Sequence, residues 1–362
     1  MTESQANGMV VGLGHVGLCC ADALLRSDID IIACDFKPVH ERTLARAYEV
    51  SDVGTSKAAA LTEYARRMGR EHLLVAVHGR FEESIGGGDL RAVRRTFLCA
   101  DRPSAVRRCW EVLSAVGDPQ GLVTTVNVGM NAAQVRTFRL DGCGPCPFCT
   151  TSAQYFAASH ADLAISCEDA GSIPEGGDRY SIPYGMHESY CAAGIALSGM
   201  VAPGWDATLS LTEPGHLMIS AIPRDPDCPV CGEGTMRWPE ASATVEADAP
   251  LHEACARAAA DSGLTEELTV RFLRPISRGT HCACGRRDAP RMMRVECGVC
   301  GGRIAPLRGC GFTMALEELR AGGATARSLN LPPRDLILLQ DGTGQQVTLL
   351  TTEGGSFESI TS

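Results

Sequence analysis

The sequence predicts an α/β fold, with a mostly parallel sheet covered by helices on both faces and a smaller cysteine-bearing domain after it. First, the apolar run Met9–Val11 leads into the glycine-rich segment Gly12–Gly17, and a helical apolar stretch follows. Second, another apolar run ends at Asp35. Third, helical and strand-like patterns then alternate as far as Leu140. Strand, glycine turn, helix, strand and acid form the first βαβ unit of a Rossmann-like fold.

The remaining elements of the first domain follow from the same periodicities. We expect a polar, glycine-rich loop over Arg80–Asp89 and a long loop from about Cys167 to Met186. Strands are expected at Met9–Val11, Ile29–Cys34, His72–His78, Arg94–Ala100, Leu122–Val128 and Gln134–Leu140, with a hairpin over Ala207–Ala221. Helices are expected at Leu18–Leu25, Lys57–Met68, Ala105–Val116 and His187–Met200.

A second domain is expected because 362 residues are too many for one ordinary core. The composition around Arg237–Asp248 is typical of a linker, so we place the domains at 1–236 and 237–362. The second domain is predicted to hold a helix at Leu251–Ser262, a strand at Leu268–Leu273, a helix at Met314–Leu319 and a hairpin of Leu336–Leu339 with Val347–Thr351.

Composition and charge exclude several classes of protein. The formal net charge is -10, which disfavours nucleic acid as the main partner because phosphate binding needs a basic face. The apolar stretch from Tyr190 to Pro203 is too short to cross a bilayer, which takes about 20 residues. Met1–Gly8 lacks the basic start and apolar run of a signal peptide, so we expect a cytoplasmic protein.

Eighteen cysteines are the most unusual feature of the composition. Five are expected to be small buried hydrophobic residues, namely Cys19, Cys20, Cys34, Cys99 and Cys109. Most of the others form closely spaced pairs, which in a reducing compartment indicate zinc knuckles. The first predicted structural zinc site uses Cys146, Cys149, Cys228 and Cys231, with Cys143 as a competing ligand. The second, in a zinc ribbon, uses Cys282, Cys284, Cys297 and Cys300, with His281 or Cys310 as substitutes.

A redox-active dithiol is the alternative interpretation of the first two pairs. Neither pair opens a predicted helix, where a reactive thiolate would gain most stabilisation. A closed site of four thiolates joins two distant loops and leaves no open coordination position. We therefore favour a structural metal site over redox chemistry.

The glycine-rich segment predicts a nucleotide site. Gly12, Gly14 and Gly17 let the backbone approach a phosphate at a helix N-terminus, where free N–H groups and the helix dipole favour anions. Asp35 can accept hydrogen bonds from two ribose hydroxyls. Enzymes that use NAD carry the same signal, and glycines also serve tight helix–strand packing, so further residues must decide between these readings.

Several further segments follow in an ordered series. The sequence from about residue 8 to 235 resembles the ThiF/MoeB/E1 family of enzymes that activate ubiquitin-like proteins. The segments that carry the resemblance are Asp35-Phe-Lys-Pro-Val39, Thr43-Leu-Ala-Arg46-Ala47, Asp52-Val-Gly-Thr-Ser-Lys57-Ala58, Phe97-Leu-Cys-Ala-Asp101-Arg102, Gly142 to Cys149, and Arg224-Asp-Pro-Asp-Cys-Pro-Val-Cys-Gly232.

The resemblance implies an ATP-dependent adenylyltransferase that uses ATP-Mg²⁺ to adenylate the C-terminal glycine of a ubiquitin-like or sulfur-carrier protein. Arg46 and Lys57 would supply cations for the phosphates, and Asp101 an oxygen ligand for Mg²⁺. Cys167, in Ser166-Cys-Glu-Asp-Ala-Gly171, would accept the acyl group as a thioester, with Cys191 as the alternative nucleophile. The acidic neighbours of Cys167 oppose formation of its thiolate.

The resemblance also implies partners. We expect a homodimer, and a C-terminal domain that recruits the carrier or an E2-like conjugating protein. The alternative is that this domain only stabilises the protein or mediates its dimerisation. Neither a membrane nor a nucleic acid is expected as a partner.

Five positions depart from the family pattern, and they define two rival functions. His15, Lys37, Thr43, Ala47 and Arg102 stand where the family has Gly, Asp, Asn, Gln and Asn. Such changes in one pocket are the evidence for a non-catalytic scaffold that binds a carrier or a partner E1. The second rival is an NAD-dependent oxidoreductase. The placement of Lys57 and Asp101, together with the knuckles, disfavours it.

Overall fold

In this computed structural model the chain divides into two compact units. The first comprises Met1–Phe81 and Arg91–Met236, and the second comprises Glu82–Leu90 and Arg237–Ser362. The structure describes residues 7–44, 48–100, 103–128, 132–151, 186–210, 216–228, 230–231, 237–264, 267–277, 280–282, 284, 287–288, 291–292, 300, 304–306 and 310–352.

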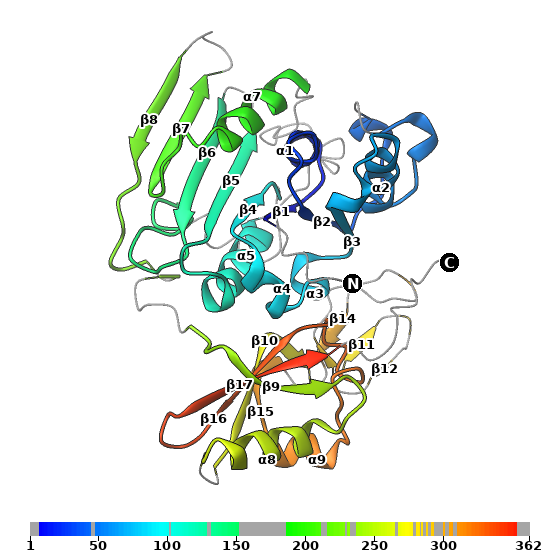
Figure 1. The fold of residues 1–362 in the computed structure, drawn as a ribbon, viewed down its shortest axis with the longest axis vertical. Helices are drawn as coiled ribbons and strands as arrows, with labels where there is room; N and C mark the ends of the chain where they lie inside the picture. The colour runs from blue at the N-terminus through cyan, green and yellow to red at the C-terminus, as the bar shows by residue number, and fades with distance from the viewer. Residues whose placement is uncertain are drawn as a thin grey trace. The chain divides into compact units, whose positions relative to one another are not determined.

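The first unit is built on one sheet, in which eight described strands follow the order β3-β2-β1-β4-β5-β6-β7-β8 (Figure 1). The strands β1 to β5 pair in parallel, as predicted, whereas β6 to β8 extend the sheet with antiparallel pairs. The bounds are β1 Gly8–Val11, β2 Ile31–Asp35, β3 Leu74–His78, β4 Arg95–Leu98, β5 Leu122–Val128, β6 Ala132–Arg139, β7 Trp205–Ser210 and β8 Leu217–Ala221.

The strand order places a topological switch point between β1 and β4. The chain winds outward through β2 and β3 on one side of β1, and through β4 and β5 on the other. In open α/β sheets, ligands bind beyond the carboxyl ends of the strands at such a point. The glycine-rich segment follows β1 directly and therefore lies at this place in the fold.

Helices cover both faces of the sheet. The buried side chain of Val135 belongs to the same core as residues of α1 and α7, whereas Phe138 packs edge-on against Trp110 of α5, with ring centroids 5.9 Å apart. Residues three apart on a strand point to opposite faces, so these helices lie on opposite sides. The helices of this unit are α1 His15–Arg26, α2 Lys57–Arg67, α5 Pro103–Val116 and α7 Met186–Leu197, with 3-10 turns η1 Glu41–Thr43, η2 Val50–Asp52 and η3 Glu71–Leu73.

The predicted loop over Arg80–Asp89 is wrong. This segment contains the short helices α3, Phe81–Ser84, and α4, Gly87–Ala92. Its three consecutive glycines disfavour helix in isolation, and their close packing against distant residues overrides that local preference.

The second unit contains a sheet with the strand order β13-β10-β16-β17-β9, in which β15 also pairs with β10, and a smaller sheet ordered β12-β11-β14. Residues of α8, α9 and the larger sheet form its hydrophobic core. The bounds are β9 Ala241–Glu246, α8 Leu251–Asp261, β10 Thr269–Ser277, β11 Thr280–Cys282, β12 Arg287–Asp288, β13 Arg291–Met292, β14 Ile304–Pro306, β15 Cys310–Ala315, α9 Leu316–Ala321, β16 Leu336–Gln340 and β17 Gln346–Thr352.

The predicted linker over Arg237–Asp248 is also partly wrong, because it contains β9. This strand pairs in parallel with β17, and Val245 is its buried residue. A polar edge strand with a single buried side chain lacks the alternation by which strands are recognised. In the described parts of both units, no helix combines the length and the apolar character needed to cross a membrane.

Candidate functional site

The glycine-rich turn joins the end of β1 to the start of α1, and its glycines serve different purposes. Gly12 has a φ of +88°, a conformation that residues with a Cβ rarely adopt. A Cβ on Gly17 would lie 1.8 Å from the carbonyl oxygen of Gly12, so the helix and the turn are in direct backbone contact. A Cβ on Gly14 would meet no atom within 4 Å. Gly12 and Gly17 therefore shape the turn, while the space beside Gly14 is open.

The first turn of α1 faces this open space with an uncompensated dipole. Its N-cap residue is Gly14, which provides no side-chain cap, and the first turn has no acidic residue. Unpaired N–H groups and the helix dipole at such an end attract anions. Burial, followed by the charge of Lys57, lowers the pKa of His15 below its usual 6.5, so its imidazole is neutral near pH 7.

Asp35, at the carboxyl end of β2, holds the turn in place. Its Oδ2 accepts a 2.6 Å hydrogen bond from the backbone N–H of Leu13, and its Oδ1 accepts a 2.8 Å bond from the N–H of Lys37. The carboxylate is buried, and the Nζ of Lys57 lies 3.9 Å from its Oδ2. Asp35, at the end of β2, is thus hydrogen-bonded to the backbone of Leu13, the residue that follows Gly12.

Lys57 enters this site from the first residue of α2. The N-cap of that helix is Ser56, whose Oγ accepts a 3.1 Å hydrogen bond from the N–H of Ala59. Only 3% of the Lys57 side chain is exposed, so Lys57 does not lie on a solvated helix face.

Two features of the site were missed by the sequence analysis. Tyr48 is buried, and its hydroxyl donates a 3.1 Å hydrogen bond to the carbonyl of Leu13. Burial, followed by the charge of Asp35, raises its pKa, which keeps the hydroxyl protonated. An aromatic residue in an otherwise polar loop was the available signal.

The second missed feature is a cationic cluster beyond the ends of β2 and β3. The guanidinium of Arg80 lies 4.1 Å from the ring centroid of Phe36, and the Nζ of Lys37 lies 5.8 Å from the same centroid. Phe36 directly follows Asp35 in the sequence, so these cations lie near the turn. Such a position favours an anionic ligand.

Four residues proposed from the sequence lie outside the described residues. They are Arg46, Asp101, Cys167 and Cys297. Cys191, the alternative nucleophile, is part of α7 and is half-buried.

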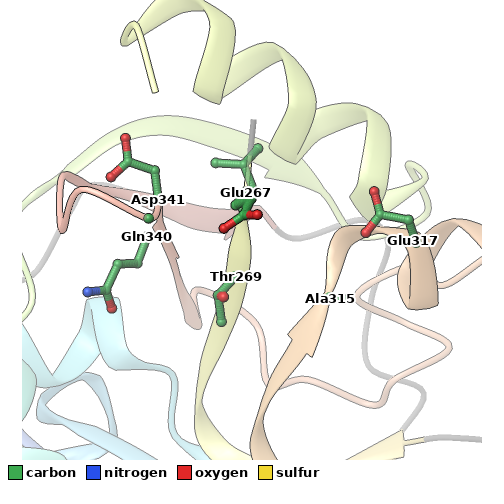
Figure 2. Close-up of a pocket in the computed structure, with 8 residues that line it drawn as sticks. Glu267, Thr269, Ala315, Glu317, Gln340 and Asp341 are labelled. Carbon is green, nitrogen blue, oxygen red and sulfur yellow. The ribbon is translucent and has the colours of Figure 1, made fainter. Parts of the chain in front are cut away.

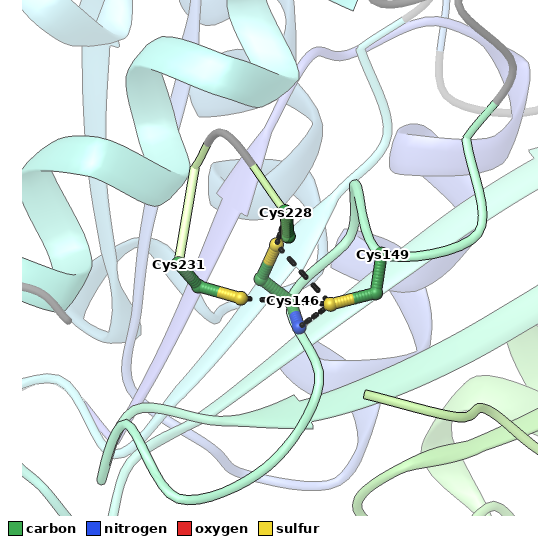
Figure 3. Close-up of side chains that lie close together, drawn as sticks. All are labelled: Cys146, Cys149, Cys228 and Cys231. Carbon is green, nitrogen blue, oxygen red and sulfur yellow. Dashed lines mark hydrogen bonds between the residues drawn. The ribbon is translucent and has the colours of Figure 1, made fainter. Parts of the chain in front are cut away.

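Four cysteines of the first unit converge from two loops 82 residues apart, as Figure 3 shows. The sulfurs of Cys146 and Cys228 are 3.6 Å apart, and those of Cys149 and Cys231 are 3.5 Å apart. All four lie within 4.8 Å of one another. Bond lengths of about 2.3 Å from a tetrahedral zinc ion to sulfur put the sulfurs about 3.8 Å apart. The arrangement is therefore that of a closed four-thiolate site, and Cys143 is not part of this group.

The electrostatics of this cluster favour a bound cation. Burial raises the pKa of Cys231 to about 11 and also raises that of Cys146. The backbone N–H of Cys146 donates a hydrogen bond to the sulfur of Cys149, with a nitrogen–sulfur distance of 3.3 Å. The N–H of Phe148 donates to the sulfur of Cys146, also at 3.3 Å. These donors favour the thiolate form, and a cation bound among the four sulfurs would balance the charge of the deprotonated cluster.

A second group of cysteines lies in the second unit. Cys282, Cys284 and Cys300 have their sulfurs within 4.8 Å of one another, and those of Cys282 and Cys300 are 3.3 Å apart. Cys282 ends β11 and is buried, whereas the other two are exposed. Three ligands at this spacing can hold a metal ion with a fourth from a neighbouring residue.

The second unit also has an open cavity of about 570 Å³, shown in Figure 2. Three carboxylates line it, from Glu267, Glu317 and Asp341. The Oδ1 of Asp341 accepts hydrogen bonds from the N–H groups of Thr343 and Gln345, so this carboxylate builds the turn after β16. None of the residues proposed from the sequence lines this cavity.

Comparisons with known proteins give distant structural likenesses. No protein-family model and no curated protein match the sequence. The structure of E. coli MccB solved with ATP is 16% identical, with a TM-score of 0.44, over 63% of this chain and 66% of MccB. MccB in complex with N-formylated MccA is 16% identical, with a TM-score of 0.46, over 63% of this chain and 67% of that one. PaaA is also 16% identical, with a TM-score of 0.41, over 60% of this chain and 73% of its own.

Proposed function

We propose that this protein binds ATP-Mg²⁺ and adenylates the C-terminal glycine of a ubiquitin-like or sulfur-carrier protein. The observation that carries the proposal is the arrangement at the carboxyl ends of β1 and β2. An open glycine turn is fixed by Asp35, and the buried ammonium of Lys57 lies 3.9 Å from that carboxylate. Ribose hydroxyls would bind at Asp35, and phosphates would bind at the N-terminus of α1 and near Lys57.

Adenylation requires the site to position the reacting groups and to stabilise the negative charge that develops on the phosphate oxygens. An oxygen of the carrier's carboxylate forms a bond to the α-phosphorus of ATP, the bond from that phosphorus to the bridging oxygen breaks, and pyrophosphate leaves. Negative charge gathers on the phosphate oxygens, so the α1 dipole and Lys57 would act where that charge develops. The neutral imidazole of His15 would offer a hydrogen-bonding group to the ligand without adding a net charge to the site.

The residues outside the described part complete the proposal through the sequence resemblance. Arg46 would bind phosphate, Asp101 would hold Mg²⁺, and the thiolate of Cys167 would attack the acyl-adenylate carbonyl and release AMP as a thioester forms. The resemblance also supports a homodimer and an E2-like partner as parts of this proposal.

Structural zinc is a further part of the proposal. Cys146, Cys149, Cys228 and Cys231 fit the metal in number, spacing and burial, and the ion would supply only the charge that joins their two loops. Cys282, Cys284 and Cys300 would bind a second zinc ion together with Cys297.

The test is ATP–pyrophosphate exchange with the purified protein and a candidate ubiquitin-like or sulfur-carrier protein that ends in glycine. We expect exchange that depends on the carrier, and a thiol-sensitive carrier adduct on Cys167 by mass spectrometry. The variant Asp35→Asn should lose exchange because its amide cannot accept from both backbone N–H groups. Asp28→Asn is the matched control, because Asp28 is exposed and its φ of 56° suits asparagine.

The rival functions give different results in the same experiment. ATP binding and carrier binding without exchange would indicate a scaffold, for which the substitutions at His15, Lys37 and Thr43 are the motivating residues. Tight binding of NAD in place of ATP would contradict adenylation and indicate an oxidoreductase.

A further inference from the structure

A nine-residue segment of the first unit's sequence is built into the second unit. Glu82–Leu90, here called the strap, lies between β3 and β4 along the chain but belongs to the second compact unit. The strap is therefore separated from the rest of its unit by nearly 150 residues of sequence.

A side chain on any glycine of the strap would collide with backbone or leucine side chains of the second unit. A Cβ on Gly86 would lie 2.0 Å from the carbonyl oxygen of Pro333, and one on Gly87 would lie 2.5 Å from Cδ1 of Leu273. A Cβ on Gly88 would lie 2.7 Å from Cδ1 of Leu350. Three consecutive glycines thus let the backbone pack directly on β10, β17 and the segment before β16.

Buried polar groups fix the strap at the same place. The guanidinium of Arg274 is fully buried, forms a 2.5 Å ion pair with Asp335, and donates to the carbonyl oxygen of Ile85 in the strap. The N–H of Gly87 donates to Asp335 over 3.1 Å, and that of Gly88 donates to the carbonyl of Arg334 over 2.7 Å.

Removal of the strap would therefore leave defects inside the second unit. Arg274 and Asp335 would each lose a buried hydrogen-bond partner, and buried polar groups without partners are costly. Leu273 and Leu336, which contact the Gly87 position, would lose their cover. The second unit needs the strap to complete its core.

The strap begins close in sequence to the candidate nucleotide site. Arg80, two residues before Glu82, lies over the ring of Phe36, and Phe36 directly follows Asp35. A ligand that contacts Asp35 or the cations around Phe36 therefore acts on the chain from which the strap emerges.

We propose that the strap is a conformational coupling device through which occupancy of the first unit's site changes the stability of the second unit's core. When the strap is docked, the carbonyl of Ile85 accepts a hydrogen bond from Arg274, and the strap covers Leu273 and Leu336. A ligand that displaces the chain at Arg80 would weaken both the hydrogen bond and this packing.

The test is hydrogen exchange of the full chain, followed by mass spectrometry. Without nucleotide, the strap amides of Gly87 and Gly88 should exchange as slowly as those of β10 and β16. Gly87→Val should speed exchange in β10 and β16 about tenfold or more, because its side chain would force the buried side chains of Leu273 and Leu336 to move. Strands β1 and β5 should keep wild-type rates.

Two further variants keep the result interpretable. Gly322→Ala is the matched glycine control, since its Cβ would meet only the Glu318 carbonyl, at 3.4 Å, and it should exchange as wild type does. Arg274→Lys retains the charge beside Asp335 but shortens the reach to Ile85, so it should loosen β10 and β16 less than Gly87→Val does. Unchanged rates in both Gly87→Val and Arg274→Lys would overturn the proposal.

The final arm adds ATP, and it rests on the proposed function. We expect ATP to change exchange in the strap and in β16 of the wild type, and to leave β16 unchanged in Arg274→Lys. ATP that protects β1 and β2 but not the strap would overturn the coupling while leaving nucleotide binding intact. Failure of ATP to protect any strand would contradict the proposed function, whereas the Gly87→Val comparison would still decide whether the strap completes the core.

Discussion

Asp35 carries out a structural role that is separable from ligand binding. Its two oxygens accept from the N–H groups of Leu13 and Lys37, so the carboxylate closes the glycine turn before any ligand arrives. A carboxylate offers about four acceptor positions, so these bonds are compatible with additional ribose hydroxyls. The turn is therefore pre-organised, and binding a nucleotide would not require Asp35 to give up its backbone partners.

His15 provides a prediction about pH at the same scale. Its pKa is lowered in the folded protein by burial and by Lys57, relative to the usual 6.5. The unfolded chain therefore binds a proton at this residue more readily than the folded one, and the contribution of neutral His15 to stability is lost as pH falls below about 6.5. His15→Gln should lose less stability than the wild type between pH 7.5 and 5.5.

Urea denaturation at several pH values measures this difference. His72→Gln, which removes an exposed histidine of η3, is the control for loss of a histidine as such. If His15→Gln and the wild type lost the same stability over this range, the imidazole would not be held neutral in the folded state.

At the scale of elements, the glycine turn offers a matched pair of substitutions. Gly17→Ala should destabilise the protein by about 3 kcal/mol or more, because its Cβ would meet the Gly12 backbone and has no flexible neighbour to displace. Gly14→Ala should leave stability nearly unchanged, since the space there is open and its φ of -68° suits alanine.

Gly14→Ala should impair nucleotide binding, although it leaves stability nearly unchanged. A methyl group beside the N-terminus of α1 would obstruct a phosphate, so Gly14→Ala should weaken ATP binding about tenfold. Calorimetry with ATP and thermal unfolding of the same samples measure the two effects. Wild-type ATP affinity in Gly14→Ala would place the phosphates away from this turn.

The cluster of Cys146, Cys149, Cys228 and Cys231 predicts how much zinc the purified protein contains. The purified protein should contain one zinc ion bound by the first cysteine cluster, and Cys146→Ser should remove one equivalent by elemental mass spectrometry and destabilise the first unit. Cys143→Ser is the control, because Cys143 is exposed and lies outside the cluster. Equal zinc content in Cys146→Ser and the wild type would rule out this cluster as the site.

Local sequence predicted the elements whose partners are close along the chain. The turn at Gly12 and the acid at Asp35 form one βαβ unit, so their spacing alone indicates their contact. The strap was predicted as a loop because the residues that explain its glycines, Pro333 and Leu350, lie far along the chain. Likewise β9 has one buried residue, and its partner strand β17 is about 100 residues away. Long-range packing left no periodic signal at these places.

At the scale of the whole molecule, the chain crosses between its two units more often than the sequence suggests. It leaves the first unit for the strap, returns at Arg91, and leaves again at Arg237. The second unit therefore cannot be complete before its last strands, β16 and β17, are made. The ion pair of Arg274 and Asp335 lies at the junction of these parts of the chain.

The last prediction concerns this buried pair. Arg274→Met alone, or Asp335→Leu alone, should destabilise the second unit by about 3–5 kcal/mol, because each leaves an uncompensated buried charge. The double variant Arg274→Met with Asp335→Leu should cost clearly less than the sum, since it removes both charges together. Some cost should remain, because the Ile85 carbonyl and the Gly87 N–H of the strap keep no partner in the double variant.

Urea unfolding followed by the fluorescence of Trp238 measures these effects in the second unit. Trp110 and Trp205, both in the first unit, are replaced by phenylalanine so that the buried Trp238 reports alone. Additive costs would mean that the two charges do not interact energetically. A double variant as stable as the parent would mean that the strap's polar contacts contribute nothing, and that its glycine packing alone holds it on the second unit.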